Sequence, residues 1–495
     1  MSDITAPGHA FVRTELVAPA PPPATSTGVV GWIWMRLFGG WLNTLLTVAS
    51  LYLIWRIVPP VLDFLIFDAV WTGSSRDDCL AEQIGREVGA CWPFIRAKFT
   101  QLVYGFYPWE EHWRVDLTFA LGAALLVPLL IPRVPYKGLN AILFFGVYPF
   151  VAFFLLVGGK MSMFALGLTA ATVELVLDGI AGMGALPVVG PLLTTIAYLL
   201  AIVTWPFRAL LGALDWGPGP LWNDVILTGI TACAVVWYVT RRSGAAERRR
   251  ALLITLAAML AIVLVIKALG ADTGRLPYVE TRAWGGLLVT LVVAVTGIVA
   301  SLPLGIMLAL GRRSRLPVVR FLSVVFIEFW RGVPLITVLF FATYMLPLFL
   351  PNNWSIDSLL RALVGVALFS AAYMAEVVRG GLQAIPRGQY EGAMALGLGY
   401  WRMMGLIVLP QALKLVIPGI VNTFIGLFKD TTLVLIVSIF DFLGQLRAAF
   451  ADPNWSTPVT LFTGFAFAGL VYFAFCFGMS RYSLFIERRL NVQRR

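Results

Sequence analysis

Residues 379–410 read RGGLQAIPRGQYEGAMALGLGYWRMMGLIVLP and separate two long apolar runs. Pro386 fits the first turn of a helix, where its missing N–H costs nothing. Gly397 and Gly399 are typical of a helix stop followed by a turn, and a second short helix can then run to Pro410. The stretch therefore predicts a helical hairpin of mixed polarity, whereas most other apolar runs are joined by short loops.

The two helices of this hairpin would offer a surface to another protein. The first presents small side chains that let a partner backbone approach closely: Gly392, Ala393, Ala395 and Gly397. The second presents adaptable apolar side chains: Met403, Met404, Leu406 and Ile407. Glu391, at the start of the small-residue run, adds an anionic anchor. The alternative is an amphipathic loop that lies on the lipid headgroups, and composition taken alone favours this alternative.

Composition places the chain among membrane proteins. Of its 495 residues, 59% are hydrophobic and 13% are charged, and the mean hydropathy is +0.85, whereas soluble domains are about half apolar and about a quarter charged. The net charge of +11 could suggest a nucleic-acid partner. However, the basic residues stand in short loops between apolar runs, as the positive-inside rule describes, and no aromatic and basic stripe supports a nucleic-acid surface.

Twelve apolar runs are candidate membrane spans, since a span needs about 20 mostly apolar residues to cross about 30 Å of hydrocarbon. They are 41–58, 115–132, 139–158, 161–180, 189–211, 221–240, 251–269, 284–310, 319–348, 358–378, 411–436 and 457–480. Two runs are weak, because 161–180 carries Glu174 and Asp178 and because Pro206 interrupts 189–211. If these two do not cross, ten spans remain.

The basic loops set the orientation of these spans. Four clusters are expected in the cytosol: Arg133 with Lys137, Arg241 to Arg250, Arg312 to Arg320, and Arg481 to Arg495. The acidic stretch 60–114 then lies outside. Both termini are expected in the cytosol, whether the chain has twelve spans or ten.

Two of the four cysteines, Cys79 and Cys91, fall in the polar stretch that is expected outside. An oxidising periplasm would permit a disulfide between them. The chain has only two histidines and no Cys-x-x-Cys or Cys/His spacing, so the sequence predicts no metal site.

The hairpin resembles the sequence signature of binding-protein-dependent ABC importer permeases, in which Glu-Ala-Ala is followed at fixed intervals by Gly, Ile and Leu-Pro. The matching positions, with every spacing kept, are Glu391, Gly392, Ala393, Gly397, Ile407, Leu409 and Pro410. Gly392 is the one departure, since the family usually has alanine there. Glycine costs about 1 kcal/mol in a helix interior but keeps the surface small, so we expect the role to be retained.

Other stretches of the sequence point to one branch of this family. FWRGVPLI (Phe329–Ile336) and FKDTTLVLIVS (Phe428–Ser438) are similar to the polar amino-acid branch of this family. LIPRVPYKGLNAILFF (Leu130–Phe145) looks like the M-type permease of the general L-amino-acid (Aap/Bzt) importer. The resemblance covers residues 1–160 and 272–490, and it leaves the segment between them unexplained.

The resemblance implies an all-α, polytopic membrane protein with a type I ABC importer permease core of five spans, preceded by extra N-terminal spans. Together with composition it divides the chain into five parts. These are a disordered cytosolic tail (1–35), a three-span region (36–160) with a periplasmic loop (60–114), a hydrophobic insert of two to four spans (161–271), the permease core (272–485) with its cytosolic coupling loop (379–410), and a basic cytosolic tail (486–495).

The function that the resemblance implies is that of a permease subunit of an ATP-driven importer for L-amino acids in the bacterial inner membrane. The implied partners are two ABC ATPase subunits, a second permease of Q type, a periplasmic amino-acid-binding protein and the lipid bilayer. No catalytic residue and no cofactor is expected in this chain, because the ATPase would bind ATP and Mg²⁺. The Gly159–Lys160 pair lacks the Ser or Thr of a phosphate-binding loop.

Charged side chains inside spans are costly, so they indicate function by default. A zwitterionic substrate needs both signs of charge, and the candidates along its path are Glu328, Arg331, Lys429, Asp430, Thr431 and Thr432. Glu328 and Arg331 share a helix face and can pair, so they could instead lock helices together. Locking is our preferred interpretation for Glu376 and Arg379, which repeat that spacing beside the hairpin. Threonine in a span often bonds its own backbone.

The main alternative function is a secondary transporter of about twelve spans. It would explain the hydrophobicity and the charges within the spans. However, the sequence shows no inverted internal repeat and no pair of broken helices, which are typical of such transporters.

Overall fold

The computed structural model describes residues 28–131, 133–134, 137–144, 148–158, 190–213, 229–230, 232–234, 236–237, 241, 244–269, 276–349 and 356–492. Within these ranges the chain is helical and forms no strand, only isolated bridges. Among the described residues, six helices are long and apolar enough to cross a membrane, and a seventh candidate span consists of two helices bent by 101°. The all-α, polytopic fold class is therefore confirmed.

The chain forms two compact units, residues 1–93 with 457–463, and residues 94–456 with 464–495. The first unit contains α1 (Gly28–Leu37), α2 (Trp41–Leu62), the π-helical turn η1 (Asp63–Phe67), the 3-10 turn η2 (Asp77–Cys79) and α3 (Ala81–Ile84). No residue of α2 is buried, as expected for a helix that faces lipid. Its span continues through η1 to Phe67.

The polar loop that follows α2 is closed by a disulfide between Cys79 and Cys91, whose Cα atoms lie 5.7 Å apart. Val70 donates its N–H to the carbonyl of Ala90, at 2.8 Å, which pairs the two sides of the loop. The Asp78 carboxylate accepts from the N–H groups of Ser74 and Ser75. These two backbone hydrogen bonds lower the pKa of Asp78.

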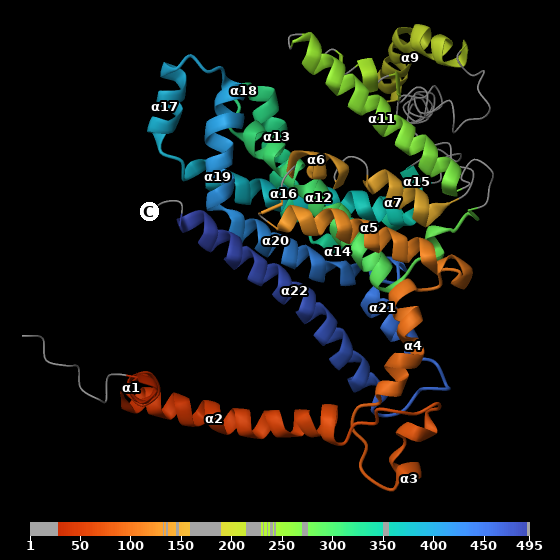
Figure 1. Cartoon of the computed structure of the whole chain (residues 1–495), viewed down its shortest axis with the longest axis vertical. Helices are drawn as coiled ribbons and strands as arrows, with labels where there is room; N and C mark the ends of the chain where they lie inside the picture. Colours follow the sequence, from red (N-terminus) through yellow and green to blue (C-terminus); the bar gives the residue numbers. More distant parts are fainter. Residues whose placement is uncertain are drawn as a thin grey trace, which may run out of the picture. The chain divides into compact units, whose positions relative to one another are not determined.

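The second unit holds most of the helices (Figure 1). They are α4 (Trp92–Tyr104, which starts in the first unit), η3 (Trp109–Glu111), α5 (His112–Leu130), α6 (Lys137–Ile142), α7 (Tyr148–Val157), α9 (Gly190–Ala213), α11 (Ala245–Leu269), η7 (Thr281–Ala283), α12 (Gly286–Arg312), α13 (Pro317–Gly332), α14 (Leu335–Phe340), η8 (Phe341–Met345), α15 (Leu346–Phe349), α16 (Ser358–Gln383), α17 (Arg387–Ala395), α18 (Tyr400–Met403), η9 (Met404–Val408), α19 (Leu409–Leu415), α20 (Ile417–Asp430), η10 (Thr431–Val437), α21 (Phe442–Ala449) and α22 (Thr460–Val492, which also starts in the first unit).

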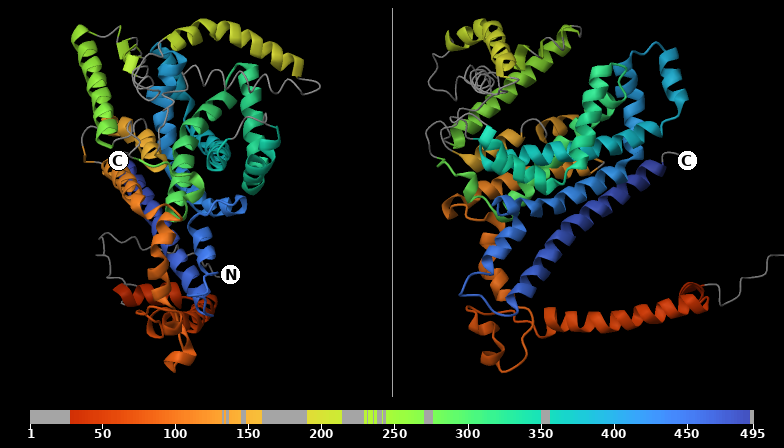
Figure 2. Two further views of the ribbon diagram at one scale, coloured as in Figure 1. Left: turned by 90° about the vertical axis from the view of Figure 1, so that its right-hand side faces the viewer. Right: turned by 180° about the vertical axis from the view of Figure 1, so that it is seen from behind.

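The packing of α12 against α16 forms the centre of this unit, as Figures 1 and 2 show. Gly297, Ser301 and Gly305 stand four residues apart on α12 and make a stripe of small side chains. A Cβ added to Gly305 would lie 2.7 Å from the Cβ of Met374 on α16, so the two backbones approach closely. Such stripes let helices pack in a membrane, where van der Waals contact replaces the hydrophobic effect.

The helices account for most of the predicted spans. The runs starting at 41, 115, 284, 358, 411 and 457 correspond to the six long helices, and the run 319–348 is the bent pair α13 and α14 to α15. The run 139–158 is divided between α6 and α7, while 189–211 and 251–269 lie in α9 and α11. The run 161–180 and most of 221–240 fall outside the described residues.

Two predicted tails differ from the structure. Residues 28–35, which we expected in a disordered tail, belong to α1 because GVVGWIWMRL is apolar enough to fold as a helix. The basic tail expected from residue 486 begins inside α22, which runs to Val492. Arg488 and Arg489 stand on this helix, which continues the last span.

A buried arginine holds the chain on both sides of the segment 159–275. Arg114 is fully buried and donates through Nε to the carbonyl of Leu155 (2.5 Å) and through Nη1 to that of Pro277 (3.0 Å). Next to it, Val279 donates its N–H to the carbonyl of Val157, at 2.9 Å. Residues 155–158 and 277–279, on the two sides of the segment, are therefore held together at one place.

The ring of Tyr107 packs against the guanidinium of Arg114, whose Cζ lies 5.8 Å from the ring centroid. Burial raises the pKa of Tyr107 to about 12. The phenol therefore stays protonated and donates to the carbonyl of Leu156, at 2.8 Å.

We predict that Gly158→Ala destabilises the protein more than Gly397→Ala. Both glycines have positive φ, +65° and +72°, so each substitution costs about 1–2 kcal/mol for the left-handed conformation. At Gly158 the new Cβ would also lie 2.2 Å from Nη2 of Arg114, and such crowding adds about 1–3 kcal/mol. At Gly397 nothing lies within 4 Å. Thermal unfolding in detergent compares the two, and equal shifts of the midpoint would contradict the role of Arg114 in holding Leu155 and Pro277 together.

Candidate functional site

The predicted hairpin forms an elbow, which we define as residues 384–415 with helices α17, α18 and α19 and the turn η9 (Figure 1). The chain enters it from α16, whose C-cap is Ala384. Ile385 is buried, and Pro386 is the N-cap residue of α17. The first helix of the hairpin therefore begins one residue after the expected proline.

The end of α17 is a Schellman motif centred on Gly397. Leu398 donates its N–H to the carbonyl of Ala393 (3.1 Å), and Gly397 donates to that of Met394 (2.9 Å). This pattern requires a left-handed residue, and Gly397 supplies it with φ +72°. The glycine of the sequence motif thus sets the angle at which the chain turns from α17 into α18.

The second helix does not end at Pro410, in contrast to the prediction. It continues through the π-helical turn η9 and then through α19 to Leu415. Because the π turn widens the helix just before Pro410, it relieves the clash between the proline ring and the carbonyl four residues earlier. The following span begins only at Ile417.

The elbow is fastened to the ends of α12 and α16 by one arginine and one tyrosine. Arg313 donates through Nη1 to the carbonyl of Leu382 (3.0 Å) and to the hydroxyl of Tyr390 (3.1 Å). The Tyr390 hydroxyl also donates to the carbonyl of Leu382, at 3.2 Å. The Arg313 guanidinium lies over the Tyr390 ring, with Cζ 5.6 Å from its centroid. Tyr390 of α17 is therefore linked to the end of α12 through Arg313 and to the end of α16 through Leu382.

The inner face of the elbow is part of a hydrophobic cluster with α12, α13, α16 and α20. Ala393 is 2% exposed, and Met403 and Met404 are 8% and 4% exposed. We expected these three side chains to offer a surface to a partner, and that was wrong. Their helix faces are turned inward because Met374 and Val378 of α16 complete the same cluster.

The outer face combines one acid with exposed apolar side chains. Glu391 and Gly392 are exposed, and nothing lies within 4 Å of a Cβ added to Gly392. Leu396, Trp401 and Leu406 are 78%, 76% and 71% exposed. Leu396 and Trp401 were not predicted as surface residues, although the sequence has a large apolar residue on each side of the glycine turn.

A network of five charged side chains joins α12, α13 and α16 beside the elbow: Arg312, Glu328, Arg331, Glu376 and Arg379. Arg312 Nη1 lies 2.9 Å from Glu328 Oε1 and 2.7 Å from Glu376 Oε1. Arg379 Nη2 lies 2.6 Å from Glu376 Oε2. Arg331 Nη1 is 3.8 Å from Glu376 and 4.0 Å from Glu328. The two sequence pairs thus belong to one network, in which Glu376 faces three guanidinium groups.

Lys429, Asp430, Thr431 and Thr432 stand where α20 changes into the 3-10 helix η10. The Thr431 hydroxyl donates to the carbonyl of Phe428 (2.8 Å), and that of Thr432 donates to the carbonyl of Lys429 (2.9 Å). Lys429 is exposed and Asp430 is half-buried. Asp430 lies roughly 20 Å along α20 from the elbow, at 1.5 Å per residue, so this group and the charged network are separate.

Within the part of the chain that the structure describes, no group of three or more His, Cys, Asp or Glu side chains is placed to hold a metal ion. The outer face of the elbow offers one carboxylate and several exposed apolar side chains.

Residues 301–492 match the family described as binding-protein-dependent transport system inner membrane component. The chain is 39% identical to the inner membrane amino-acid ABC transporter permease protein YhdY of Escherichia coli, over 97% of this chain and 98% of that protein. It is 40% identical to the glutamate/glutamine/aspartate/asparagine transport system permease protein BztC of Rhodobacter capsulatus, over 98% of this chain and 99% of that protein.

Among solved structures, the chain is similar to the crystal structure of an amino acid ABC transporter with histidines. The identity is 27%, the match covers 41% of this chain and 92% of that chain, and the TM-score is 0.36.

We predict that Ala393→Leu lowers the free energy of unfolding by about 1–3 kcal/mol, because it overfills a packed cluster. Ala395→Leu, two residues further along the same helix, is the matched control. Its position is exposed, so the change should stay within about 0.5 kcal/mol. Equilibrium unfolding in mixed micelles measures both variants, and equal destabilisation would refute the assignment of the inner face.

Proposed function

This chain belongs to the family of binding-protein-dependent transport system inner membrane components, and we infer from this that it is the permease subunit of an ATP-driven ABC importer for amino acids in the inner membrane. It forms the path through the membrane, and separate ATPase subunits hydrolyse ATP. A substrate-binding protein and a second permease complete such an importer. The relatives lend no support to a secondary transporter.

We propose that the elbow is the element that receives the ATPase. The observation that carries this proposal is its division into two faces, one packed in the core through Ala393 and the other exposed around Glu391. An ATPase that docks on the outer face would move α17 as a lever. Arg313 and Tyr390 would then pass the movement to α12 and α16.

We assign the finer composition as two ATPase subunits, one permease partner of Q type and a periplasmic binding protein for L-amino acids. ATP and Mg²⁺ would be bound by the ATPase, and this chain would bind no cofactor. Both termini would lie in the cytosol, which the basic clusters after α5 and α12 and in the last turns of α22 support.

We propose the segment 272–485 as the permease core and 161–271 as an insertion into the family's usual sequence. The hydrogen bond between Val279 and Val157 supports this division, because it brings together the two ends of the segment that would be inserted. The three-span region 36–160 precedes the insertion.

Two roles are proposed for the charged residues within the spans. Glu328 and Arg331 share the network at the elbow end of α12 and α16, which favours a role in coupling over direct substrate contact. Lys429 and Asp430 interrupt the α20 span away from that network, and we propose them for the translocation path. The hydroxyls of Thr431 and Thr432 already have backbone partners, so they would shape the path through the 3-10 turn.

We predict that Glu391→Lys abolishes ATP-coupled uptake while the protein still inserts and folds. The side chain is exposed, so the substitution disturbs no packing but reverses the charge that faces the ATPase. The measurements are amino-acid uptake in proteoliposomes and copurification of the ATPase. The matched control is Glu82→Lys, the same reversal in the disulfide-closed loop, which should leave ATPase binding unchanged. Full uptake by Glu391→Lys would refute the docking role.

We also predict that Asp430→Asn reduces the rate of uptake at least tenfold, while the yield of assembled complex stays within twofold. The substitution keeps the side-chain size but removes the negative charge beside Lys429. Uptake and size-exclusion chromatography of the same preparation separate the two effects. If assembly fails and the residual complex transports normally, Asp430 has a structural role instead.

A further inference from the structure

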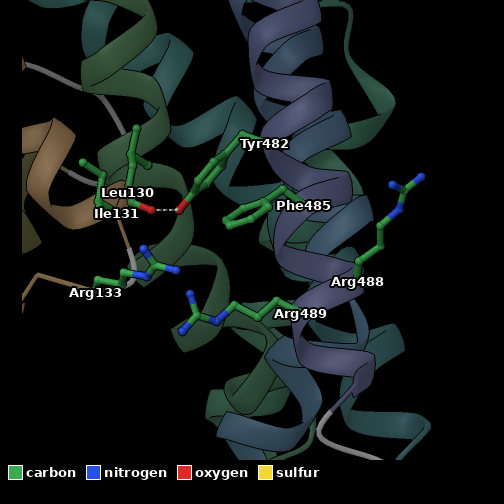
Figure 3. A pocket seen from close by; sticks show the side chains of 7 residues that line it. All are labelled: Leu130, Ile131, Arg133, Tyr482, Phe485, Arg488 and Arg489. Carbon is green, nitrogen blue, oxygen red and sulfur yellow. Dashed lines mark hydrogen bonds between the residues drawn. The ribbon is translucent and has the colours of Figure 1, made fainter.

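An open groove of about 750 Å³ lies between the ends of α5 and α22. Its lining residues are Leu130, Ile131, Arg133, Tyr482, Phe485, Arg488 and Arg489. Figure 3 shows Arg133, in the turn after α5, and Arg489, on α22, extending toward each other across it. The Arg488 side chain points away to the other side of α22.

The two facing guanidinium groups have no carboxylate partner among the residues that the structure describes. Within the described residues, neither Arg133 nor Arg489 makes an ion pair within 4.0 Å. Glu487 is close in sequence but does not line the groove. Two like charges that face each other are unfavourable unless an anion lies between them. The groove is thus complementary in charge to a phosphate.

The arginines are not needed to cap the helix beside them. The C-terminal carbonyls of α5 already accept other donors, since the Tyr482 hydroxyl donates to Leu130 O at 3.1 Å. Lys137 Nζ donates to the carbonyls of Pro128, Leu129 and Ile131, at 3.0 Å for Leu129. The guanidinium groups therefore remain available to a ligand.

The rest of the groove is apolar. Leu130, Ile131 and Phe485 form its walls at the ends of two membrane-spanning helices. Ile131 and Phe485 are 45% and 49% exposed, so an acyl chain can reach both. A site with a basic rim above an apolar wall, placed at the end of two spans, matches a lipid with a phosphate headgroup.

We propose that this groove binds an anionic phospholipid, with its phosphate between Arg133 and Arg489 and its acyl chains along Leu130 and Phe485. The lipid would join α5, which lies outside the matched family region 301–492, to α22, the last helix within it. The proposal does not depend on the role of the elbow, because it concerns the binding of lipid and not uptake.

Native mass spectrometry of the purified complex tests the proposal, with cardiolipin and phosphatidylglycerol as probes and phosphatidylcholine as the zwitterionic reference. We expect Arg133→Ala with Arg489→Ala to weaken cardiolipin binding about thirtyfold, from the usual contribution of each arginine at a membrane surface. The matched control is Arg320→Ala with Arg481→Ala. It removes two exposed arginines that do not line the groove, and it should bind as the parent does.

Three further measurements distinguish loss of the lipid site from poor folding and from the binding of free phosphate. Arg133→Lys with Arg489→Lys retains both charges and should retain binding, even if the alanine variant folds poorly. Inorganic phosphate at millimolar concentration should not displace the lipid, and Phe485→Ala should weaken the binding of lipid. The proposal is overturned if the alanine pair and the control bind cardiolipin equally, if phosphatidylcholine binds as tightly, or if phosphate alone competes fully.

Discussion

The close approach of α12 and α16 is the constraint on which the functional parts of this permease depend. Lipid tails are as apolar as the side chains they touch, so helices in a bilayer associate through close packing and polar contacts. The small residues Gly297, Ser301 and Gly305 permit that packing. It fixes the ends of both helices side by side, and Arg312 and Arg313 can therefore reach groups on α16 and on the elbow.

The elbow combines fixation on one face with exposure on the other. Ala393 and Gly397 are small for different reasons, the first because it packs against the core and the second because its backbone is left-handed. Gly392 has open space around it, which explains why the departure from alanine at this position disturbs nothing in the chain itself. Of the small residues in the motif, Gly392 and Gly397 are exposed to a partner, whereas Ala393 is buried.

Of the twelve predicted spans, six correspond to long apolar helices among the described residues and one to a bent pair; these seven could be predicted because burial in lipid requires a long apolar run whatever its neighbours are. The sequence also predicted the turn at Gly397, since few residues other than glycine take positive φ readily. It did not predict which side of the elbow faces outward, because the rotation of α17 is set by Met374 and Val378, which are distant in sequence. The ion pair between Glu328 and Arg312 was also missed, because it joins two helices. The continuation of the helix through Pro410 was missed because it depends on a π turn, which the periodicity of the sequence does not indicate.

The pairing of Val157 with Val279, secured by Arg114, has a consequence for how such permeases vary in length. The entropic cost of closing a loop rises only with the logarithm of its length. Once its two ends are held at one point, the intervening chain can lengthen, shorten or be exchanged while the scaffold keeps the same anchoring contacts. A change in the length of the chain between Val157 and Val279 would therefore leave the packing of the surrounding helices unchanged, as long as these contacts are kept.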